Sequence, residues 1–99
     1  MVKRRSVRQE RLLKEFGANL ARWRKVNGLS ASALAERAFI TRETLSNIEN
    51  GSGSARIDSV FAVLTSLGIV DAIVKASDPY ASDAARPRID EILRSGDTL

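Results

Sequence analysis

The 99-residue sequence contains no cysteine and no histidine. The first absence excludes disulfides, thiol nucleophiles and thiolate metal ligands, and the second removes the commonest general base and metal ligand of proteins. No apolar run approaches the roughly 18 to 20 residues that span a bilayer. The basic N-terminus has no apolar segment behind it, so no secretion signal is expected. These absences predict an intracellular, cytoplasmic protein with no membrane span, metal or cofactor.

The remaining polar residues do not form an enzyme-like pattern. Carboxylates are scattered over the predicted helix surfaces, without a glycine-rich phosphate loop beside them. Asp90 and Glu91 are adjacent and therefore point to different sides of any helix, as solvated charges do. Ser30 and Thr41 are better explained as helix caps than as nucleophiles. We therefore expect no enzymatic activity.

Charge is distributed unevenly along the chain. Residues 1–56 hold twelve Lys or Arg and five Asp or Glu, a net charge of +7, whereas residues 57–99 hold four and seven, a net charge of −3. This asymmetry is typical of a chain whose first half meets a polyanion. Solvated helix faces are the alternative explanation.

Helical spacing accounts for most of the sequence. The first helix is expected from about Ser6, which with Gln9 has the spacing of a capping box, to about Asn27, and Gly28 is placed to end it. Its apolar residues share one face: Leu12 or Leu13, Phe16, Leu20 and Trp23. The residues before this helix are expected to form a flexible basic arm that includes Lys3, Arg4 and Arg5.

Two shorter helices are predicted next. Ser30 can cap the second helix, which ends at about Arg37, and residues 38–40 make the turn that follows it. Thr41 can cap the third helix, which should end near Gly51. Two short helices joined by a tight turn are the arrangement with which many proteins read the DNA major groove.

The second half of the chain is expected to hold two apolar helices and a polar tail. The fourth helix, over residues 57–67, is apolar over a wide arc and should be buried against several others. The fifth helix has more apolar surface than a small bundle needs, and part of it is expected to face a second copy of the chain: Ile69, Val70, Ile73 and Val74. In the tail Pro87 breaks any continuous helix, and one last helical turn is predicted around Ile89, Ile92 and Leu93.

The third helix has a polar face suited to base recognition. On a helical wheel Leu45 and Ile48 face the core, with Thr41 beside them. The opposite face, called the recognition arc below, comprises Arg42, Glu43, Ser46, Asn47 and Asn50. Arg pairs with guanine, Asn with adenine and Glu with cytosine, each good pairing discriminating by roughly 1–3 kcal/mol. The alternative is that any surface helix shows a polar face.

The flanking sequences make the pattern more specific. They are Leu20-Ala21-Arg22-Trp23-Arg24-Lys25, Gly28-Leu29-Ser30, Leu34-Ala35-Glu36-Arg37, Thr41 to Ile48 followed by Glu49-Asn50-Gly51, and Ile57-Asp58-Ser59 through Leu67-Gly68. Together they resemble the XRE family of helix-turn-helix regulators, the group that contains the Cro and lambda-type phage repressors. The resemblance implies an all-α, five-helix, lambda-repressor-like domain over residues 16–76. A basic arm and helix extension (1–15) would precede it and a C-terminal tail (77–99), partly flexible or partner-binding, would follow.

The resemblance also implies roles for individual residues. The third helix would lie in the major groove of a palindromic operator bound by a homodimer, as in a bacterial or phage repressor. Base-reading positions would be Arg42, Glu43 and Asn47, with Ser46 on the same arc. Contacts to the DNA backbone are expected from Ser30, Thr41, Thr44, Asn50, Arg4, Arg5 and Arg8. Arg24 would pair with Glu49, which the wheel independently places at the edge of the buried face.

The sequence departs from this family at three places. Ala31 stands where a glutamine often supports the recognition helix, which weakens the expected affinity, and Phe39 stands where the turn usually has glycine, which predicts an altered turn. The loop around Ser52 and Gly53 lacks the basic residues and proline that relatives often carry. The basic arm would compensate by reaching phosphate or minor groove. A disordered solubilising tail is the alternative for that arm.

The tail has a looser resemblance to a subset of the same family, the HipB-type antitoxins encoded beside kinase-like toxins. The relevant pieces are Thr65-Ser66-Leu67-Gly68-Ile69-Val70-Asp71-Ala72-Ile73-Val74, Ser77-Asp78-Pro79-Tyr80 and Ala84-Ala85-Arg86. This likeness implies an alternative function. The dimer would repress its own operon and also bind a toxin protein through the fifth helix and tail.

Overall fold

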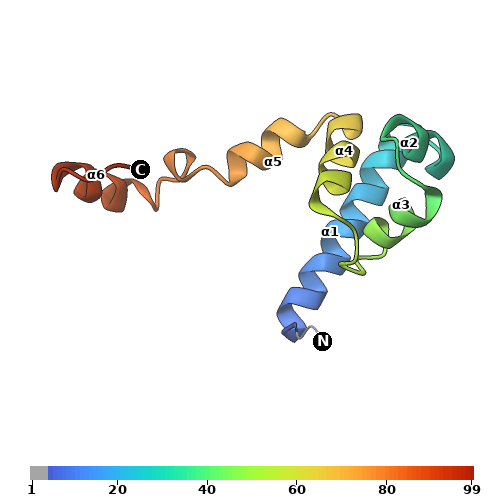
Figure 1. The fold of residues 1–99 in the computed structure, drawn as a ribbon, viewed down its shortest axis with the longest axis horizontal. Helices are drawn as coiled ribbons and strands as arrows, with labels where there is room; N and C mark the ends of the chain where they lie inside the picture. The colour runs from blue at the N-terminus through green and yellow to red at the C-terminus, as the bar shows by residue number, and fades with distance from the viewer. Residues whose placement is uncertain (1–4) are drawn as a thin grey trace. The chain divides into compact units, whose positions relative to one another are not determined.

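The computed structural model describes residues 5–99, and within that range all regular structure is helical (Figure 1). The elements are α1 (Val7–Val26), α2 (Ala31–Arg37), α3 (Arg42–Glu49), α4 (Ile57–Leu67), α5 (Val70–Ala76), the 3₁₀ turn η1 (Pro79–Ala81) and α6 (Arg86–Arg94). The predicted all-α class is confirmed. The chain divides into two compact units, one up to Gly68 and one from Ile69 onward.

Side-chain caps start the first three helices at the predicted residues. Ser6 Oγ accepts a 3.0 Å hydrogen bond from the backbone N–H of Gln9, and Ser30 Oγ accepts one of 3.0 Å from Ala33. Thr41 Oγ1 accepts a 3.0 Å hydrogen bond from the N–H of Thr44. Each cap satisfies an amide that the helix cannot pair internally, which stabilises a helix by about 1 kcal/mol.

The core of the first unit receives side chains from all four of its helices. Its most deeply buried members are Leu20, Leu34, Leu45, Val63 and Leu64. Leu45 and Ile48 are the buried residues of α3, as the wheel predicted. Helix α1 packs against both α3 and α4, and α2 packs against α3 and α4. The short helix α3 is therefore stabilised by its packing against α1 and α2.

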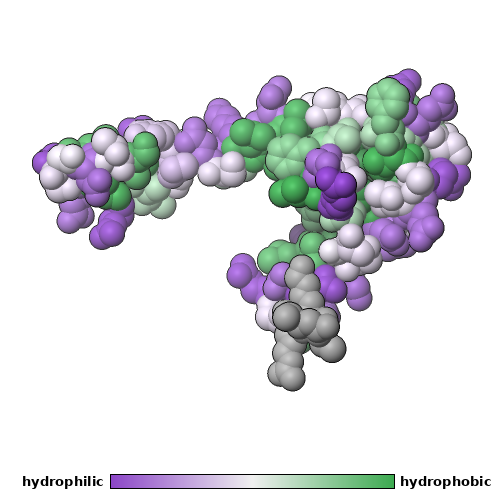
Figure 2. All heavy atoms as spheres, viewed as in Figure 1, coloured by the Kyte–Doolittle hydropathy of each residue, from purple (hydrophilic) through white to green (hydrophobic). Residues whose placement is uncertain are grey.

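Helix α4 is less buried than its sequence predicts. Val63, Leu64 and Leu67 are buried, but Ile57 is 74% exposed and Phe61 is 38% exposed. Helix α4 packs against two other helices, α1 and α2, as expected, but part of its apolar arc stays exposed. A small unit has too little interior to cover every apolar side chain, so only the stripe that faces α1 and α2 is covered. Figure 2 shows hydrophobic side chains at the surface of this unit.

The second unit consists of α5, η1 and α6. Helix α5 has no buried residue, and Ile89 of α6 is the buried hydrophobic residue of this unit, at 3% exposed. Helix α6 is longer than the single turn predicted. Pro87 does not interrupt it, because this residue lies in the first turn, where a missing N–H breaks no helical hydrogen bond. In residues 5–99 no helix is long and apolar enough to cross a membrane.

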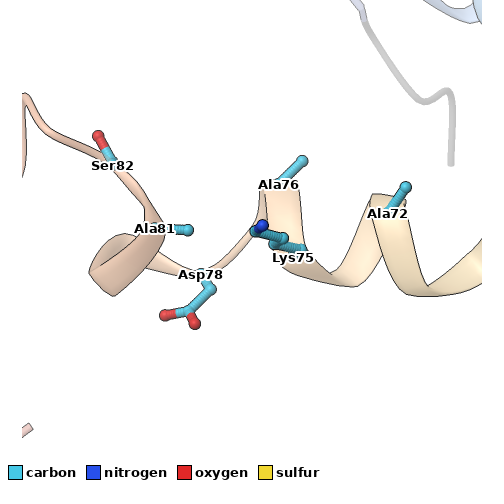
Figure 3. A pocket seen from close by; sticks show the side chains of 6 residues that line it. All are labelled: Ala72, Lys75, Ala76, Asp78, Ala81 and Ser82. Carbon is cyan, nitrogen blue, oxygen red and sulfur yellow. The ribbon is translucent and has the colours of Figure 1, made fainter.

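A shallow hollow of about 330 Å³ lies between α5 and η1 (Figure 3). Its walls are mostly small side chains: Ala72, Ala76, Ala81 and Ser82, with Lys75 and Asp78. The carboxylate of Asp78 caps η1 by accepting a 2.9 Å hydrogen bond from the N–H of Tyr80. Ligand sites usually enclose their ligand and converge several polar groups on it, and this hollow does neither.

Candidate nucleic-acid interface

The structure places the recognition arc on the side of α3 that faces away from the core. Arg42, Glu43, Ser46 and Asn50 are exposed and Asn47 is half-buried, while Leu45 and Ile48 are buried on the other side. The residues expected to read bases therefore lie together on one helical face. Their donors and acceptors match those that base edges present in the major groove.

The hydroxyl groups that cap α2 and α3 are engaged differently: Ser30 only accepts a hydrogen bond, whereas Thr41 also donates its O–H to Thr44. Ser30 Oγ accepts from a backbone amide, which leaves its own O–H free to donate. At the start of α3, Thr41 and Thr44 are joined by a 2.9 Å hydrogen bond between their hydroxyl groups. The expected backbone-contacting hydroxyls are thus held at the beginnings of α2 and α3.

Arg24 of α1 fastens the end of α3. Its Nε and Nη2 donate hydrogen bonds of 2.8 Å and 3.2 Å to the two carboxylate oxygens of Glu49, and both side chains are largely buried, at 14% and 13% exposed. Arg24 Nη1 also donates a 3.1 Å hydrogen bond to the carbonyl oxygen of Leu29, just before α2. The hydrogen bond to Glu49 raises the pKa of Arg24, although partial burial opposes the rise. One guanidinium group therefore fixes α1, α3 and the entrance to α2 relative to one another.

Arg42, the first residue of α3, is held by a residue that sequence reasoning did not select. Its Nη1 donates a 2.7 Å hydrogen bond to Oγ of Ser32 on α2. Next to it lies a hollow of about 240 Å³, lined by Arg24, Ala31, Arg42, Leu45, Ser46, Glu49 and Asn50. An exposed serine near the start of a helix gives no sequence signal of such a role.

The other end of the recognition arc is linked to the loop that follows α3. Asn50 Nδ2 donates a 3.2 Å hydrogen bond to Ser46 Oγ. The carbonyl oxygen of Asn47 accepts hydrogen bonds from the N–H of Ser52, at 3.1 Å, and from its Oγ, at 3.2 Å. The loop is therefore folded back onto the last turn of α3.

Comparison with known families agrees with this geometry. The model of the helix-turn-helix domain family matches residues 15–76, which include α2, α3, α4, α5 and most of α1. The chain belongs to the helix-turn-helix domain family. Its predicted membership of this DNA-binding class is confirmed. No curated protein matches the chain.

Arg5, which precedes the residues matched by the helix-turn-helix family, contacts the protein itself. Its Nη1 donates a 3.2 Å hydrogen bond to the carbonyl oxygen of Ser52, and its guanidinium lies against Gly53. Arg5 was expected in a flexible arm, but it braces the loop after α3. Arg8 is exposed on the first turn of α1. Arg4 and Lys3, the other expected arm residues, lie outside the described residues.

The turn of the helix-turn-helix motif contains a strained aromatic residue. Phe39 has φ +55°, a left-handed conformation that costs a residue other than glycine about 1–2 kcal/mol. The backbone thus adopts at Phe39 the left-handed conformation that glycine enters without strain. The ring is 95% exposed, so packing does not offset the strain.

A close helix contact at Gly17 is a second feature that sequence reasoning missed. Gly17 is buried in α1, and a Cβ added there would meet the backbone carbonyl groups of Ile48 and Glu49 at the end of α3. An isolated glycine inside a strongly amphipathic helix was the available signal, because such a residue usually has a packing reason.

The residues expected at a dimer interface are all on or beside α5. Ile69 and Val70 are half-buried, Ile73 is 36% exposed and Val74 is 49% exposed. The single chain therefore leaves most of the apolar surface of α5 uncovered.

Proposed function

We propose that the protein is a sequence-specific transcriptional regulator, a repressor that binds its operator with α3 in the major groove. The observation that carries this proposal is the recognition arc, which is exposed on a helix whose opposite face is buried and whose end is tied to α1 by Arg24. A helix held in this way has a fixed backbone, so less backbone entropy is lost on binding.

Different residues at and around the recognition arc are suited to contact the base edges and the DNA backbone. We assign the base-edge contacts to Arg42, Glu43, Ser46 and Asn47, because their functional groups match guanine, cytosine and adenine edges. The DNA backbone would be contacted by polar side chains of the α2–α3 region and by arginines near the N-terminus: Ser30, Thr41, Thr44, Asn50, Arg4, Arg5 and Arg8. Because Arg5 also holds Ser52, its contribution to DNA binding would include keeping that loop in place.

A homodimer follows from the apolar surface of α5. Ile73 and Val74 are exposed in the single chain, and Asp71 is the one charged side chain among residues 69–74. A two-fold dimer would place two copies of α3 against half-sites about one helical turn apart, on a palindromic operator.

In vitro selection of duplexes from a random pool tests this proposal directly. We expect an inverted repeat, bound at least 10³-fold more tightly than a scrambled duplex of the same length and composition. Sedimentation should show a dimer, and Ile73→Asp combined with Val74→Asp should give a monomer that loses affinity for the inverted repeat. No enriched motif, with equal salt-sensitive binding to both duplexes, would rule out sequence-specific recognition.

Binding of a toxin protein, with DNA binding as autoregulation, is the second candidate function. It is favoured by the second unit, which has its own helices and places the partly exposed Leu93 on the same amphipathic helix as the buried Ile89. Truncation after Lys75 should then leave DNA binding largely intact and abolish the complex with a toxin encoded beside this gene. Unchanged binding of that toxin by the truncated protein would exclude a role for the tail.

A further inference from the structure

We propose that Ser32 is a positioning residue for base recognition, because it holds the guanidinium group of Arg42 in the orientation that reads a guanine. The observation is the 2.7 Å hydrogen bond from Arg42 Nη1 to Ser32 Oγ, which joins the two helices of the motif. This inference rests on the proposed function, since it assigns Arg42 a base contact. It adds a residue on α2 to a recognition surface otherwise built from α3.

The hydrogen bond to Ser32 leaves enough N–H groups of Arg42 free to bind a guanine. A guanidinium group has five N–H donors, and each Nη nitrogen carries two of them. Ser32 takes one hydrogen of Nη1. The other hydrogen of Nη1 and those of Nη2 remain to form the two parallel bonds that arginine makes with O6 and N7 of guanine.

The hydroxyl of Ser32 has no competing structural task. Ser30, two residues earlier, is the cap of α2, and the side chain of Ser32 is exposed. Arg42 takes part in none of the ion pairs found among residues 5–99, so its partner here is a neutral acceptor that leaves its positive charge intact. A carboxylate partner would compete with DNA for the guanidinium group, because a hydrogen bond between charged groups is strong. The hydrogen bond to a neutral hydroxyl is weaker and competes much less.

The residue beside Ser32 explains why such support is needed. Ala31 has only a methyl group and faces the hollow of about 240 Å³ next to Arg42, so it offers the guanidinium no hydrogen bond. A long exposed arginine loses rotamer freedom when it is fixed on a base, and prior fixation reduces that loss. Ser32 supplies this fixation from the next position of α2.

A double-mutant cycle on the operator found by selection tests the inference. Arg42→Ala first identifies the base pair that depends on Arg42. We then expect Ser32→Ala to lower discrimination at that base pair about two- to tenfold, the range given by immobilising one flexible side chain. In the Arg42→Ala background the same change should have no further effect. Ser32→Thr, which keeps the hydroxyl, should retain discrimination.

Two controls separate positioning from a general loss of structure. Ser66→Ala removes a hydroxyl that bonds within α4, at 2.9 Å from the carbonyl oxygen of Ala62, and should leave discrimination unchanged. The thermal midpoint of Ser32→Ala should remain close to that of the wild type, because the hydroxyl is exposed.

The outcomes distinguish this inference from the proposed function. Wild-type protein that fails to prefer the selected duplex over the scrambled one would overturn the proposed function, and with it this inference. Three results would overturn the role of Ser32 alone, provided that the wild type discriminates between the duplexes. Ser32→Ala could leave discrimination unchanged, or lower it equally at every base pair. It could also lower discrimination by the same factor in the Arg42→Ala background.

Discussion

Gly17 of α1 lies directly against Glu49 at the end of α3, so that a Cβ added to Gly17 would come within 2.6 Å of the Glu49 carbonyl oxygen. This is closer than any side chain can approach a backbone that does not move. The same Glu49 accepts the hydrogen bonds of Arg24, about two turns further along α1. Helix α3 is therefore held by a small residue that permits close approach and by an ion pair that fixes its end.

Gly17→Ala should destabilise the protein even though alanine favours helix formation. Overpacking a tight contact costs roughly 1–3 kcal/mol, and the better helix propensity of alanine offsets about 1 kcal/mol. We expect a net loss of about 1 kcal/mol in the free energy of unfolding, measured by urea denaturation. A variant as stable as the wild type, or more stable, would show that helix propensity outweighs the contact with α3.

Arg24→Ala should destabilise the fold by about 2–3 kcal/mol, because the pair with Glu49 is mostly buried and its loss leaves a carboxylate without its partner. The matched control is Arg56→Ala, which breaks an exposed ion pair with Asp58 whose side chains are 84% and 67% exposed. That change should alter stability by less than about 0.5 kcal/mol. Equal effects of the two substitutions would contradict the special role of Arg24.

The contribution of the Arg24–Glu49 pair should be constant across neutral pH. Its hydrogen bond raises the pKa of Arg24 in the folded protein. A group whose pKa is raised by folding stabilises the protein fully at any pH below its pKa in the unfolded chain. The stabilisation is lost only as the pH rises through the pKa in the folded protein, which for arginine is strongly alkaline. Coupling energies from an Arg24→Ala and Glu49→Ala cycle should therefore agree at pH 6.5 and pH 9. A coupling that disappears at pH 9 would contradict this.

Phe39→Gly should stabilise the protein. The substitution removes about 1–2 kcal/mol of left-handed strain and adds roughly 0.5–1 kcal/mol of backbone entropy to the unfolded chain. A net gain of about 0.5–1 kcal/mol is expected, since the exposed ring loses no packing. Phe39→Ala removes the ring but keeps the strain, so its thermal midpoint should stay near that of the wild type. A gain from alanine equal to that from glycine would point to the ring rather than the backbone.

Substitutions of Arg42 and Arg8 should affect DNA binding in different ways. Arg42→Ala should cost about 1–3 kcal/mol at one or two base pairs and relax preference there. Arg8→Ala should weaken binding to all sequences alike and lower the salt slope by about one, as loss of a phosphate contact does. Titrations of the selected and scrambled duplexes at two salt concentrations measure both effects. Equal losses of Arg42→Ala on the two duplexes would contradict its assignment to base reading.

The helix boundaries in the first unit could be predicted because their signals are local. Ser6, Ser30 and Thr41 cap the helices that they were expected to cap, and Gly28 and Gly68 adopt the left-handed conformation at helix ends. A cap depends on a hydroxyl and an amide three residues apart, so a single sequence contains the whole interaction.

The interactions between helices were harder to predict. The Arg24–Glu49 pair was expected from the family resemblance, with the wheel in agreement, but the contacts of Gly17, Ser32 and Arg5 were not. Each of these contacts joins two different segments of the chain, and a single serine or arginine has no periodicity that marks it. The extent of burial along α4 also depends on how much interior the other helices leave, which no single segment encodes.

The separation between the two faces of α3 has a consequence for evolution. The fold depends on Leu45, Ile48 and Glu49, while Arg42, Glu43 and Ser46 are exposed and contribute little to the core. Under the proposed function, mutations in the second group would change the preferred DNA sequence while leaving the scaffold intact. Duplicated copies of such a gene could therefore acquire new target sites by a few substitutions, without first acquiring compensating changes in the interior.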